Sequence, residues 1–235
     1  MSAASSSSNP SQDMPQTTVQ KRAQTLGALI VISGPSGVGK GTLCRRLIEE
    51  YPEQLVWSVS ATSRQPRPGE VDGKDYYFLS PDDFKAGVEK GEFLEWAEYN
   101  GKFYGTPRKL VQETRETGMS VLLEIDVQGA KQVRQAISQG SEGPENTNNT
   151  ENGENLGVDA ISDVSRDATL VFIAPPSMDA LKERLIGRGT NTPEDMERRL
   201  AISAEEMTQQ HHFNHVVVND DLEACYQRLK KLLLN

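Results

Sequence analysis

The segment LIVISGPSGVGKGT, residues 29–42, joins three patterns in immediate succession. The apolar run over residues 29–32 is typical of a buried strand, and a glycine-rich turn that contains Lys40 follows it. Beyond the turn, apolar residues recur at helical spacing, at Leu43, Leu47 and Ile48. The segment therefore predicts a strand, a tight turn and an amphipathic helix.

The glycines of this turn indicate a loop that wraps a polyphosphate. Such a loop turns its backbone N–H groups inward, through conformations that glycine enters freely. The next helix presents its N-terminal N–H groups to the phosphates, and Lys40 adds a positive charge. A turn that only links strand to helix would leave the lysine unexplained. We expect the loop residues to hold the phosphates: Gly34, Pro35, Ser36, Gly37, Val38, Gly39, Lys40, Gly41 and Thr42.

The residue after Lys40 departs from the usual pattern of such loops, in which Ser or Thr follows the lysine and ligates magnesium. Here that residue is Gly41, and Thr42 comes one position later. Because a helix turns by about 100° per residue, Thr42 is not expected to face the same metal position. We therefore predict that magnesium has no direct ligand from the protein and is held mainly by phosphate oxygens and water.

Length and composition indicate an acidic protein with one hydrophobic core. Its 235 residues suffice for one substantial core with small inserted lobes. A formal net charge of −9 argues against a nucleic-acid or anionic-membrane partner, because both favour basic patches. Cys44 and Cys225 fit no metal-binding spacing, which favours ordinary packing in a reducing compartment.

Residues 1–25 are rich in Ser, Gln, Thr and Pro and lack the apolar region of a signal peptide. We expect a disordered tail and a cytoplasmic protein. An organellar transit peptide is the alternative, although such peptides are richer in arginine.

Residues 55–60, LVWSVS, alternate like a second strand, and residues 60–107 predict a small strand-rich lobe. Its proline-punctuated loop carries Arg64 and Arg67, whose guanidinium forks suit a phosphate or a carboxylate; solvated charges or salt bridges are the alternative. Asn100-Gly101 indicates a hairpin turn. Alternation in the strand before it places four residues on one face: Phe93, Glu95, Ala97 and Tyr99.

A later buried strand, at residues 120–126, ends in Glu124 and Asp126. In a phosphate-loop fold an acid at this position lies near the metal and its waters, and solvation of a strand end is the alternative. Residues 138–167 lose all periodicity and are rich in Asn, Glu, Thr and Gly. They predict a disordered acidic insertion on an exposed connection.

Two helices with a glycine between them carry a basic cluster in an otherwise acidic protein: Arg184, Arg188 and Arg199. Such a cluster is typical of a lid that closes over phosphates and withdraws to release product. Salt bridges with neighbouring glutamates are the alternative. Three histidines near the C-terminus have no acids or cysteines at ligand spacing, so we expect surface or packing roles for His211, His212 and His215.

In their order along the chain, several segments make the sequence resemble the guanylate kinases, P-loop members of the nucleoside monophosphate kinases. They are SGPSGVGKGT, SVSATSRQPRPGEVDGKDYYF, FLEWAEYNGKFYGTP, LEIDVQGA, FIAPPS, LIGRGT and VVVNDDL. The resemblance covers about residues 27–235 apart from the acidic insertion. It implies an α/β P-loop three-layer core with a parallel five-stranded sheet, an inserted strand-rich GMP-binding lobe and a short helical lid. The expected boundaries are 26–59, 108–180 and 206–235 for the core, 60–107 for the lobe, 138–167 for the insertion and 181–205 for the lid.

The resemblance also implies an ATP:GMP phosphotransferase of purine nucleotide metabolism and GMP recycling, which gives ADP and GDP. It implies that the transferring group is stabilised by Lys40, Arg184, Arg188 and Arg199, and that Asn219 lies near adenine. It implies that the GMP phosphate is bound by Arg64, Arg67, Tyr76 and Tyr104, and that guanine is bound by Ser60, Glu95 and Thr106. It places on the GMP and metal side Glu70, Glu124 and Asp126.

The carboxylate of Glu95 suits GMP as the substrate that receives the phosphoryl group. It would accept hydrogen bonds from guanine N1–H and the 2-amino group, whereas adenine has an acceptor at N1 and no 2-amino group. A buried, unpaired carboxylate should therefore reject the wrong base by several kcal/mol.

Two alternatives stay open. One is a kinase for another nucleoside monophosphate, since adenylate kinases place a glycine where this chain has Gly41. The other is a non-catalytic guanylate-kinase-like module that binds phosphopeptides, although such modules typically have an eroded phosphate loop and lack the lid arginines. The sequence leaves the oligomeric state open.

Overall fold

A five-stranded parallel sheet forms the centre of the protein, as seen in a computed structural model that describes residues 25–140, 168–187 and 192–234. The sheet order is β2-β7-β1-β8-β9. Its strands are β1 (Leu29–Ser33), β2 (Leu55–Trp57), β7 (Ser120–Glu124), β8 (Ala168–Ala174) and β9 (His215–Val218). Every residue of β1 is buried, as the continuous apolar run predicts for a strand covered on both faces.

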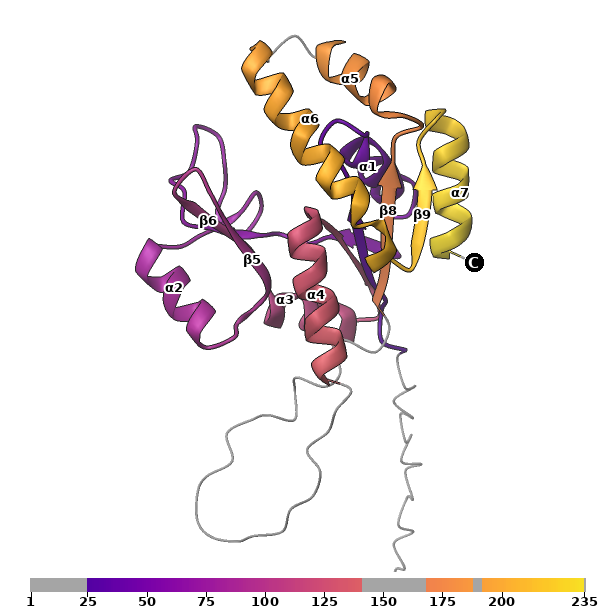
Figure 1. Ribbon diagram of the computed structural model, residues 1–235. Helices are drawn as coiled ribbons and strands as arrows, with labels where there is room; N and C mark the ends of the chain where they lie inside the picture. The colour runs from indigo at the N-terminus through magenta and orange to yellow at the C-terminus, as the bar shows by residue number, and fades with distance from the viewer. Residues whose placement is uncertain (1–24, 141–167, 188–191, 235) are drawn as a thin grey trace, which may run out of the picture.

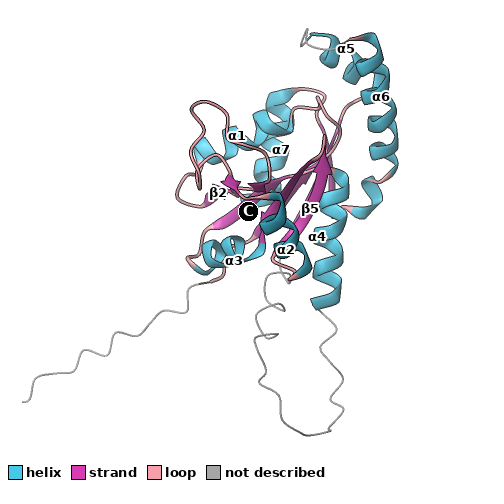
Figure 2. Cartoon of the chain, turned by 90° about the vertical axis from the view of Figure 1, so that its left-hand side faces the viewer, coloured by secondary structure: helices cyan, strands magenta, loops and turns pink. Residues whose placement is uncertain are grey.

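Helices cover both faces of this sheet and give the predicted three layers (Figure 2). One face packs against α1 (Lys40–Glu50), α5 (Met178–Gly187) and α7 (Leu222–Leu234), through a core that includes Ile30 and Ile32. The other face packs against α3 (Arg108–Glu116) and α4 (Val127–Gly140), through a core that includes Leu29 and Val31. Alternate residues of β1 thus serve two separate cores.

The predicted lobe is a second sheet, of order β4-β3-β6-β5, which lies to the left in Figure 1. It contains β3 (Ala61–Thr62), β4 (Tyr77–Phe78), β5 (Phe93–Tyr99), β6 (Lys102–Pro107) and α2 (Pro81–Glu89). Asn100 and Gly101 have φ values of 51° and 69°, as the predicted hairpin turn requires. The ring of Phe84 on α2 stacks on that of Phe93, with 4.4 Å between centroids, and gives the lobe its own small core.

The predicted lid corresponds to α5 and α6 (Pro193–Thr208), which lie at the top of Figure 1. Thr192 caps α6 by accepting a hydrogen bond from the Asp195 N–H, and Pro193 takes the first helical position. The helix continues three residues past the expected end at 205, and a short 3₁₀ helix η1 (Gln210–His212) connects it to β9.

Three details of the sequence prediction are wrong. A bulge in β5 interrupts the alternation between Phe93 and Glu95, so Phe93 packs on Phe84 and does not share the face of Glu95. Residues 138–140, assigned to the insertion, form the end of α4, and residues 58–60 do not continue β2.

The remainder of the predicted insertion, 141–167, and residues 1–24 of the predicted tail lie outside the described residues. Among the helices that the structure describes, none has the length and apolar character that crossing a membrane requires.

Candidate active site

A pocket of about 470 Å³ opens at the carboxyl end of β1, where the glycine-rich loop leads into α1. We call it the P-loop pocket. Seven of the predicted phosphate-binding residues line it: Gly34, Ser36, Gly37, Gly39, Lys40, Gly41 and Thr42. Five further residues complete the lining: Arg45, Glu124, Ile125, Asp126 and Glu206.

Backbone geometry makes the loop suitable for an anion. Gly34 has a φ of 136°, and a Cβ there would lie 2.2 Å from the carbonyl oxygen of Ile173. Gly39, with a φ of 103°, is the N-cap residue of α1 and has no side chain to occupy the helix terminus. The first N–H groups of α1 therefore remain available to a ligand in the pocket.

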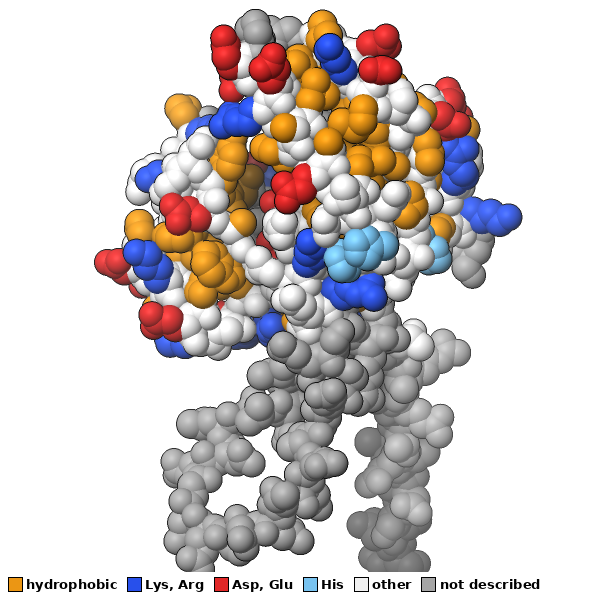
Figure 3. Space-filling model, in the orientation of Figure 1, with side chains coloured by type: hydrophobic (Ala, Val, Ile, Leu, Met, Phe, Trp, Pro, Cys, Tyr) orange, Lys and Arg blue, Asp and Glu red, His pale blue; other side chains and the backbone are white. Residues whose placement is uncertain are grey.

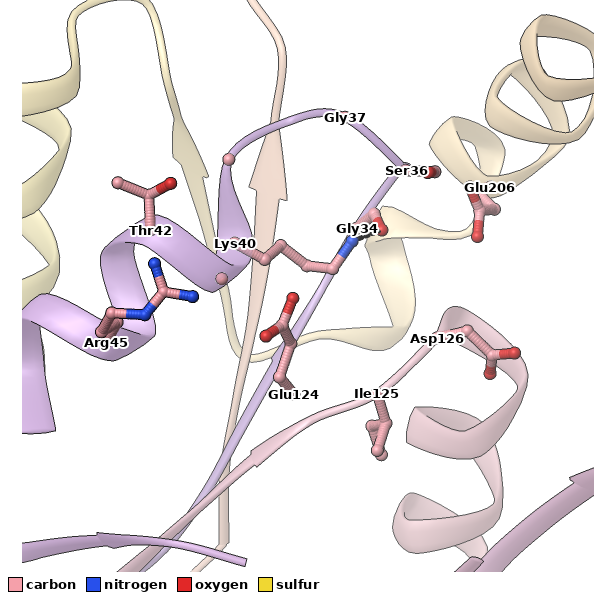
Figure 4. A pocket seen from close by; sticks show the side chains of 12 residues that line it. Gly34, Ser36, Gly37, Lys40, Thr42, Arg45, Glu124, Ile125, Asp126 and Glu206 are labelled. Atoms are coloured by element: carbon pink, nitrogen blue, oxygen red, sulfur yellow. Dashed lines mark hydrogen bonds between the residues drawn. The ribbon is translucent and has the colours of Figure 1, made fainter. Parts of the chain in front are cut away.

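Lys40 lies along the mouth of this loop (Figure 4). Its Nζ donates hydrogen bonds to the carbonyl oxygens of Gly34, at 2.5 Å, and Pro35, at 3.0 Å. Burial lowers the pKa of the ammonium, and the carboxylate of Glu124 acts in the opposite direction. The chain thus holds a partly desolvated positive charge where a phosphate would bind.

Three carboxylates from different parts of the chain line the same pocket, and each acts to raise the pKa of Lys40. Glu124 ends β7, Asp126 begins the turn into α4, and Glu206 extends from the last part of α6 (Figure 4). Burial raises the pKa of Glu206 to about 7, against the effect of Lys40, and its Oε2 has no hydrogen-bond partner among the described residues. A carboxylate oxygen of Asp126 accepts from the Gly129 N–H, at 2.7 Å, and so caps α4.

Sequence reasoning missed Arg45 and Glu206. Arg45 could have been found, because it lies four residues after Gly41 and therefore on the same side of α1. Nothing in the local sequence of α6 distinguishes Glu206 from its neighbour Glu205. Its position in the pocket depends on how α6 crosses the sheet.

Of the three arginines of the predicted lid, two lie in the part of the chain that the structure describes, and neither of these lines the P-loop pocket. Arg184 donates to the carbonyl oxygen of Asn219, at 2.8 Å, and does not line the P-loop pocket. Arg199 is half-buried on α6 and does not line it either. Arg188 lies outside the described residues.

Asn219 also lies outside the lining of this pocket. Its side-chain amide donates to the carbonyl oxygen of Val38, at 2.7 Å, and the residue is only 4% exposed. Two other loop residues do not line the pocket, Pro35 and Val38. The Val38 side chain belongs to the core between β1 and α1.

A second pocket, of about 330 Å³, lies between the lobe and the carboxyl end of β7. We call it the lobe pocket. Six predicted residues line it: Ser60, Tyr76, Glu95, Tyr104, Glu124 and Asp126. Ala97, Tyr99, Gly105 and Ile125 also line it, and the period-2 spacing from Glu95 could have identified Ala97 and Tyr99.

Glu95 is the most deeply placed acid of the lobe pocket, at 7% exposure. Burial raises the pKa of its carboxyl group to about 7, and the hydrogen bond that Thr106 Oγ1 donates to Glu95 Oε1, at 2.7 Å, acts in the opposite direction. Its Oε2 lies beside the first turn of α4, because a Cβ on Gly129 would approach it to 2.8 Å. Thr106 and α4 thus fix the orientation of the carboxylate, which leaves it little freedom to rotate.

The predicted phosphate-binding arginines behave differently from each other. Arg64 makes two hydrogen bonds of 2.9 Å to the carboxylate of Glu70, and its guanidinium carbon lies 5.2 Å from the ring centre of Tyr76. This pairing holds the pKa of Glu70 below its usual range. Arg67 is exposed and donates its backbone N–H to the same carboxylate, at 2.7 Å. Glu70 therefore organises the arginine loop.

The two pockets share Glu124, Ile125 and Asp126 and are therefore parts of one cleft. Figure 3 shows a hollow between the lobe and the rest of the protein, with acidic side chains inside it. Within the described residues, no three His, Cys, Asp or Glu side chains are grouped so as to hold a metal ion. His211 and His212, which were expected to have packing or surface roles, lie with ring centres 4.0 Å apart near the end of α6.

A parallel sheet with a glycine-rich loop between its first strand and the following helix defines a P-loop phosphate-binding protein. The family model described as "Guanylate kinase" matches residues 27–140 and 154–235. The chain belongs to the guanylate kinase family.

Known relatives and a solved structure agree with this assignment. The guanylate kinase of Rhodococcus jostii is 45% identical over 221 residues, which cover 93% of this chain and 93% of that protein. The guanylate kinase of Desulfitobacterium hafniense is 42% identical over 211 residues, 90% of this chain and 91% of that protein. The crystal structure of the guanylate kinase from Anaplasma phagocytophilum matches with a TM-score of 0.57 and 30% identity, over 90% of this chain and 86% of that one.

Proposed function

We propose that the P-loop pocket holds the polyphosphate of ATP and that the lobe pocket holds GMP. The chain is a guanylate kinase, and it transfers a phosphoryl group from ATP to GMP, giving ADP and GDP. The observation that supports our division of the site is the sharing of Glu124, Ile125 and Asp126 by both pockets. In-line transfer requires the donor and acceptor phosphates to meet, and these residues mark where two ligands would adjoin.

On the donor side, loop N–H groups and Lys40 would bind the phosphates. The Lys40 ammonium, which bonds two carbonyl oxygens of its own loop, would exchange them for phosphate oxygens. Arg184, Arg188 and Arg199 would add positive charge as the lid, residues 181–205, closes. Arg184 would first have to leave the carbonyl oxygen of Asn219. Catalysis would rest on positioning and charge neutralisation, with no covalent intermediate.

On the acceptor side, the lobe, residues 60–107, would read guanine and hold its phosphate. Glu95, oriented by Thr106, would accept from guanine N1–H and the 2-amino group, with Ser60 at the same pocket. Phosphate binding would involve the arginine loop and the two tyrosine hydroxyl groups: Arg64, Arg67, Tyr76 and Tyr104. Glu70 would hold Arg64 in place for this contact.

Guanylate kinases, as ATP-dependent phosphotransferases, generally need a divalent metal, and we propose Mg²⁺. The donor set suits a hydrated ion: Glu124, Asp126 and Glu206 offer hard oxygen atoms, and Oε2 of Glu206 is buried without a partner among the described residues. Position 41 offers no hydroxyl, because it is a glycine. Water bound to the metal would donate to these carboxylates, and the ion would neutralise charge on the transferring phosphates. We also propose a cytoplasmic location, which the two free, buried cysteines support.

A coupled assay of ADP formation tests the proposal. With ATP as donor, the wild-type chain should use GMP far better than AMP, CMP or UMP, because a base without the N1–H and 2-amino donors leaves Glu95 unpaired. The variant Lys40→Met should lower kcat about 100-fold or more while its unfolding midpoint stays close to that of the wild type. Near-normal turnover by this variant, or equal use of AMP, would contradict the assignment of the pockets.

A further inference from the structure

Asn219 connects the phosphate loop to two other parts of the protein. It follows the edge strand β9, and its backbone N–H donates to the carbonyl oxygen of Ala174 at the end of β8, at 2.7 Å. Its own carbonyl oxygen accepts from the guanidinium of Arg184 on α5, at 2.8 Å. The main chain of Asn219 is thus held from two sides, by the sheet and by a helix.

The side chain of Asn219 reaches the loop itself. Its Nδ2 donates to the carbonyl oxygen of Val38, at 2.7 Å, and the side chain is buried. The contact requires a glycine at the next position, since a Cβ on Gly39 would lie 2.7 Å from the same nitrogen. The side chain of Val38 is itself fixed in the core below the loop.

The hydrogen bond to the Val38 carbonyl also fixes the direction of the neighbouring Gly39 N–H, because both groups belong to one planar peptide unit. The peptide unit between Val38 and Gly39 is trans, and in a planar trans peptide the C=O and N–H groups point in opposite directions. With the Val38 carbonyl held against Asn219, the Gly39 N–H must point away from Asn219. Gly39 lines the P-loop pocket and Asn219 does not, which fits an N–H directed into the pocket.

We propose that Asn219 is a positioning residue of the phosphate loop, which aims the Gly39 N–H at the polyphosphate. The proposal rests on the proposed function, in which the P-loop pocket holds a polyphosphate. It differs from the role that the resemblance implies, a contact with adenine. A residue that orients the loop affects every polyphosphate equally, whereas a residue that reads adenine affects only ligands that carry the base.

The test uses ligands that separate these roles. The variants Asn219→Ala and Asn219→Leu both remove the donor without adding charge, and leucine keeps the branched shape of the side chain with a somewhat larger volume. Dissociation constants are measured by calorimetry for tripolyphosphate, ATP, ITP and GMP. We expect tripolyphosphate, ATP and ITP to bind about tenfold more weakly to both variants, as the loss of one well-placed hydrogen bond predicts, with GMP unchanged.

A matched control lies at the other end of β9. The side chain of Asn214 accepts a hydrogen bond from the Leu170 N–H, at 2.9 Å, far from the phosphate loop along the strand. Asn214→Ala should lower the urea midpoint and leave the affinity for tripolyphosphate unchanged. A second readout is the amide resonance of Gly39 in NMR spectra, whose change on addition of tripolyphosphate should shrink in both Asn219 variants and remain in Asn214→Ala.

Three results would overturn the proposal. The first is that both variants bind tripolyphosphate as tightly as the wild type. The second is that ATP binds more weakly while tripolyphosphate and ITP are unaffected. The third is that GMP loses as much affinity as the polyphosphates, which would indicate general damage to the fold. Turnover of ATP and GMP by the wild-type chain tests the proposed function separately. The ratio of each variant's dissociation constants to those of the wild type tests the role of Asn219.

Discussion

At the scale of the residue, Glu95 combines burial with a charged role. Its carboxylate is inside the lobe, receives one hydrogen bond from Thr106, and has a pKa raised to about 7 by burial. Burial away from water makes it costly in free energy to leave this carboxylate without hydrogen-bond donors. A base that supplies the donors is therefore favoured over one that does not. Specificity for guanine would therefore come with sensitivity to pH.

The pH dependence of GMP binding follows from this pKa. Guanine donors need the ionised carboxylate, so affinity should level off once the pH is about one unit above this pKa. Below that it should fall, approaching about tenfold per pH unit, as Glu95 takes up a proton. Dissociation constants for GMP between pH 5.5 and 8.5 measure this. The variant Glu95→Gln should bind GMP weakly at pH 8 and approach the wild type at pH 5.5.

The GMP phosphate titrates in the same range, and the variant controls for it because the ligand is common to both proteins. A constant ratio of the two dissociation constants across this range would show that Glu95 does not titrate in the binding site.

At the scale of the element, the first turn of α4 supports both pockets. Asp126 caps the helix through the Gly129 N–H, and Gly129 leaves room for the carboxylate of Glu95. Helix propensity alone would favour alanine over glycine at position 129, by about 1 kcal/mol. The close approach of Glu95 explains why a glycine fits better.

Gly129→Ala tests this packing. The added Cβ would lie 2.8 Å from Oε2 of Glu95, too close, so the carboxylate must move from its bond with Thr106. We expect GMP to bind about tenfold more weakly, equivalent to roughly 1.4 kcal/mol, with ATP affinity unchanged. Calorimetric titrations with each nucleotide provide the measurement.

Gly187→Ala is the control, because a Cβ at this last residue of α5 would meet open space. It should leave GMP affinity unchanged, since Gly187 is far from the lobe pocket in the chain and does not line it. Equal GMP affinity in Gly129→Ala and the wild type would mean that Glu95 can shift without loss of binding.

At the scale of the whole molecule, the P-loop pocket and the two residues that flank segment 141–167, Gly140 and Ala168, lie at opposite ends of the sheet. In a parallel sheet all the carboxyl ends lie along one edge, and the P-loop follows the carboxyl end of β1. Residues 141–167 connect the end of α4, at Gly140, to the amino end of β8, at Ala168. Figure 1 shows both attachment points away from α5, α6 and the P-loop.

Replacement of residues 141–167 by a Gly/Ser linker of about 15 residues should therefore preserve activity. The entropy of loop closure changes by only about 0.6 kcal/mol for each doubling of loop length, so stability should hardly change. Steady-state kinetics should give kcat/KM values for ATP and GMP close to those of the full chain. A folded variant without activity would show that the segment contributes to the reaction.

Much of the fold was predictable because its determinants are local. Thr192 and Pro193 start α6, Ser80 and Pro81 start α2, and the glycines of the loop adopt the backbone conformations expected from their pattern. Each of these depends on a few neighbouring residues. The bulge after Phe93 was missed, because strand alternation contains no sign of an extra residue.

The local sequence was also enough to predict the chemistry of the loop, since a strand, three glycines and a lysine are the pattern of a phosphate-binding loop. The tertiary structure alone brought Glu206 to the P-loop pocket, Asn219 to the carbonyl of Val38, and α4 to the carboxylate of Glu95. These contacts join residues far apart in the chain, and they form because β8 lies beside β1, β9 lies beside β8, and the lobe packs against α4. Side-chain periodicity reports which face of an element is buried, whereas its partner across the core is set by the packing of the complete sheet.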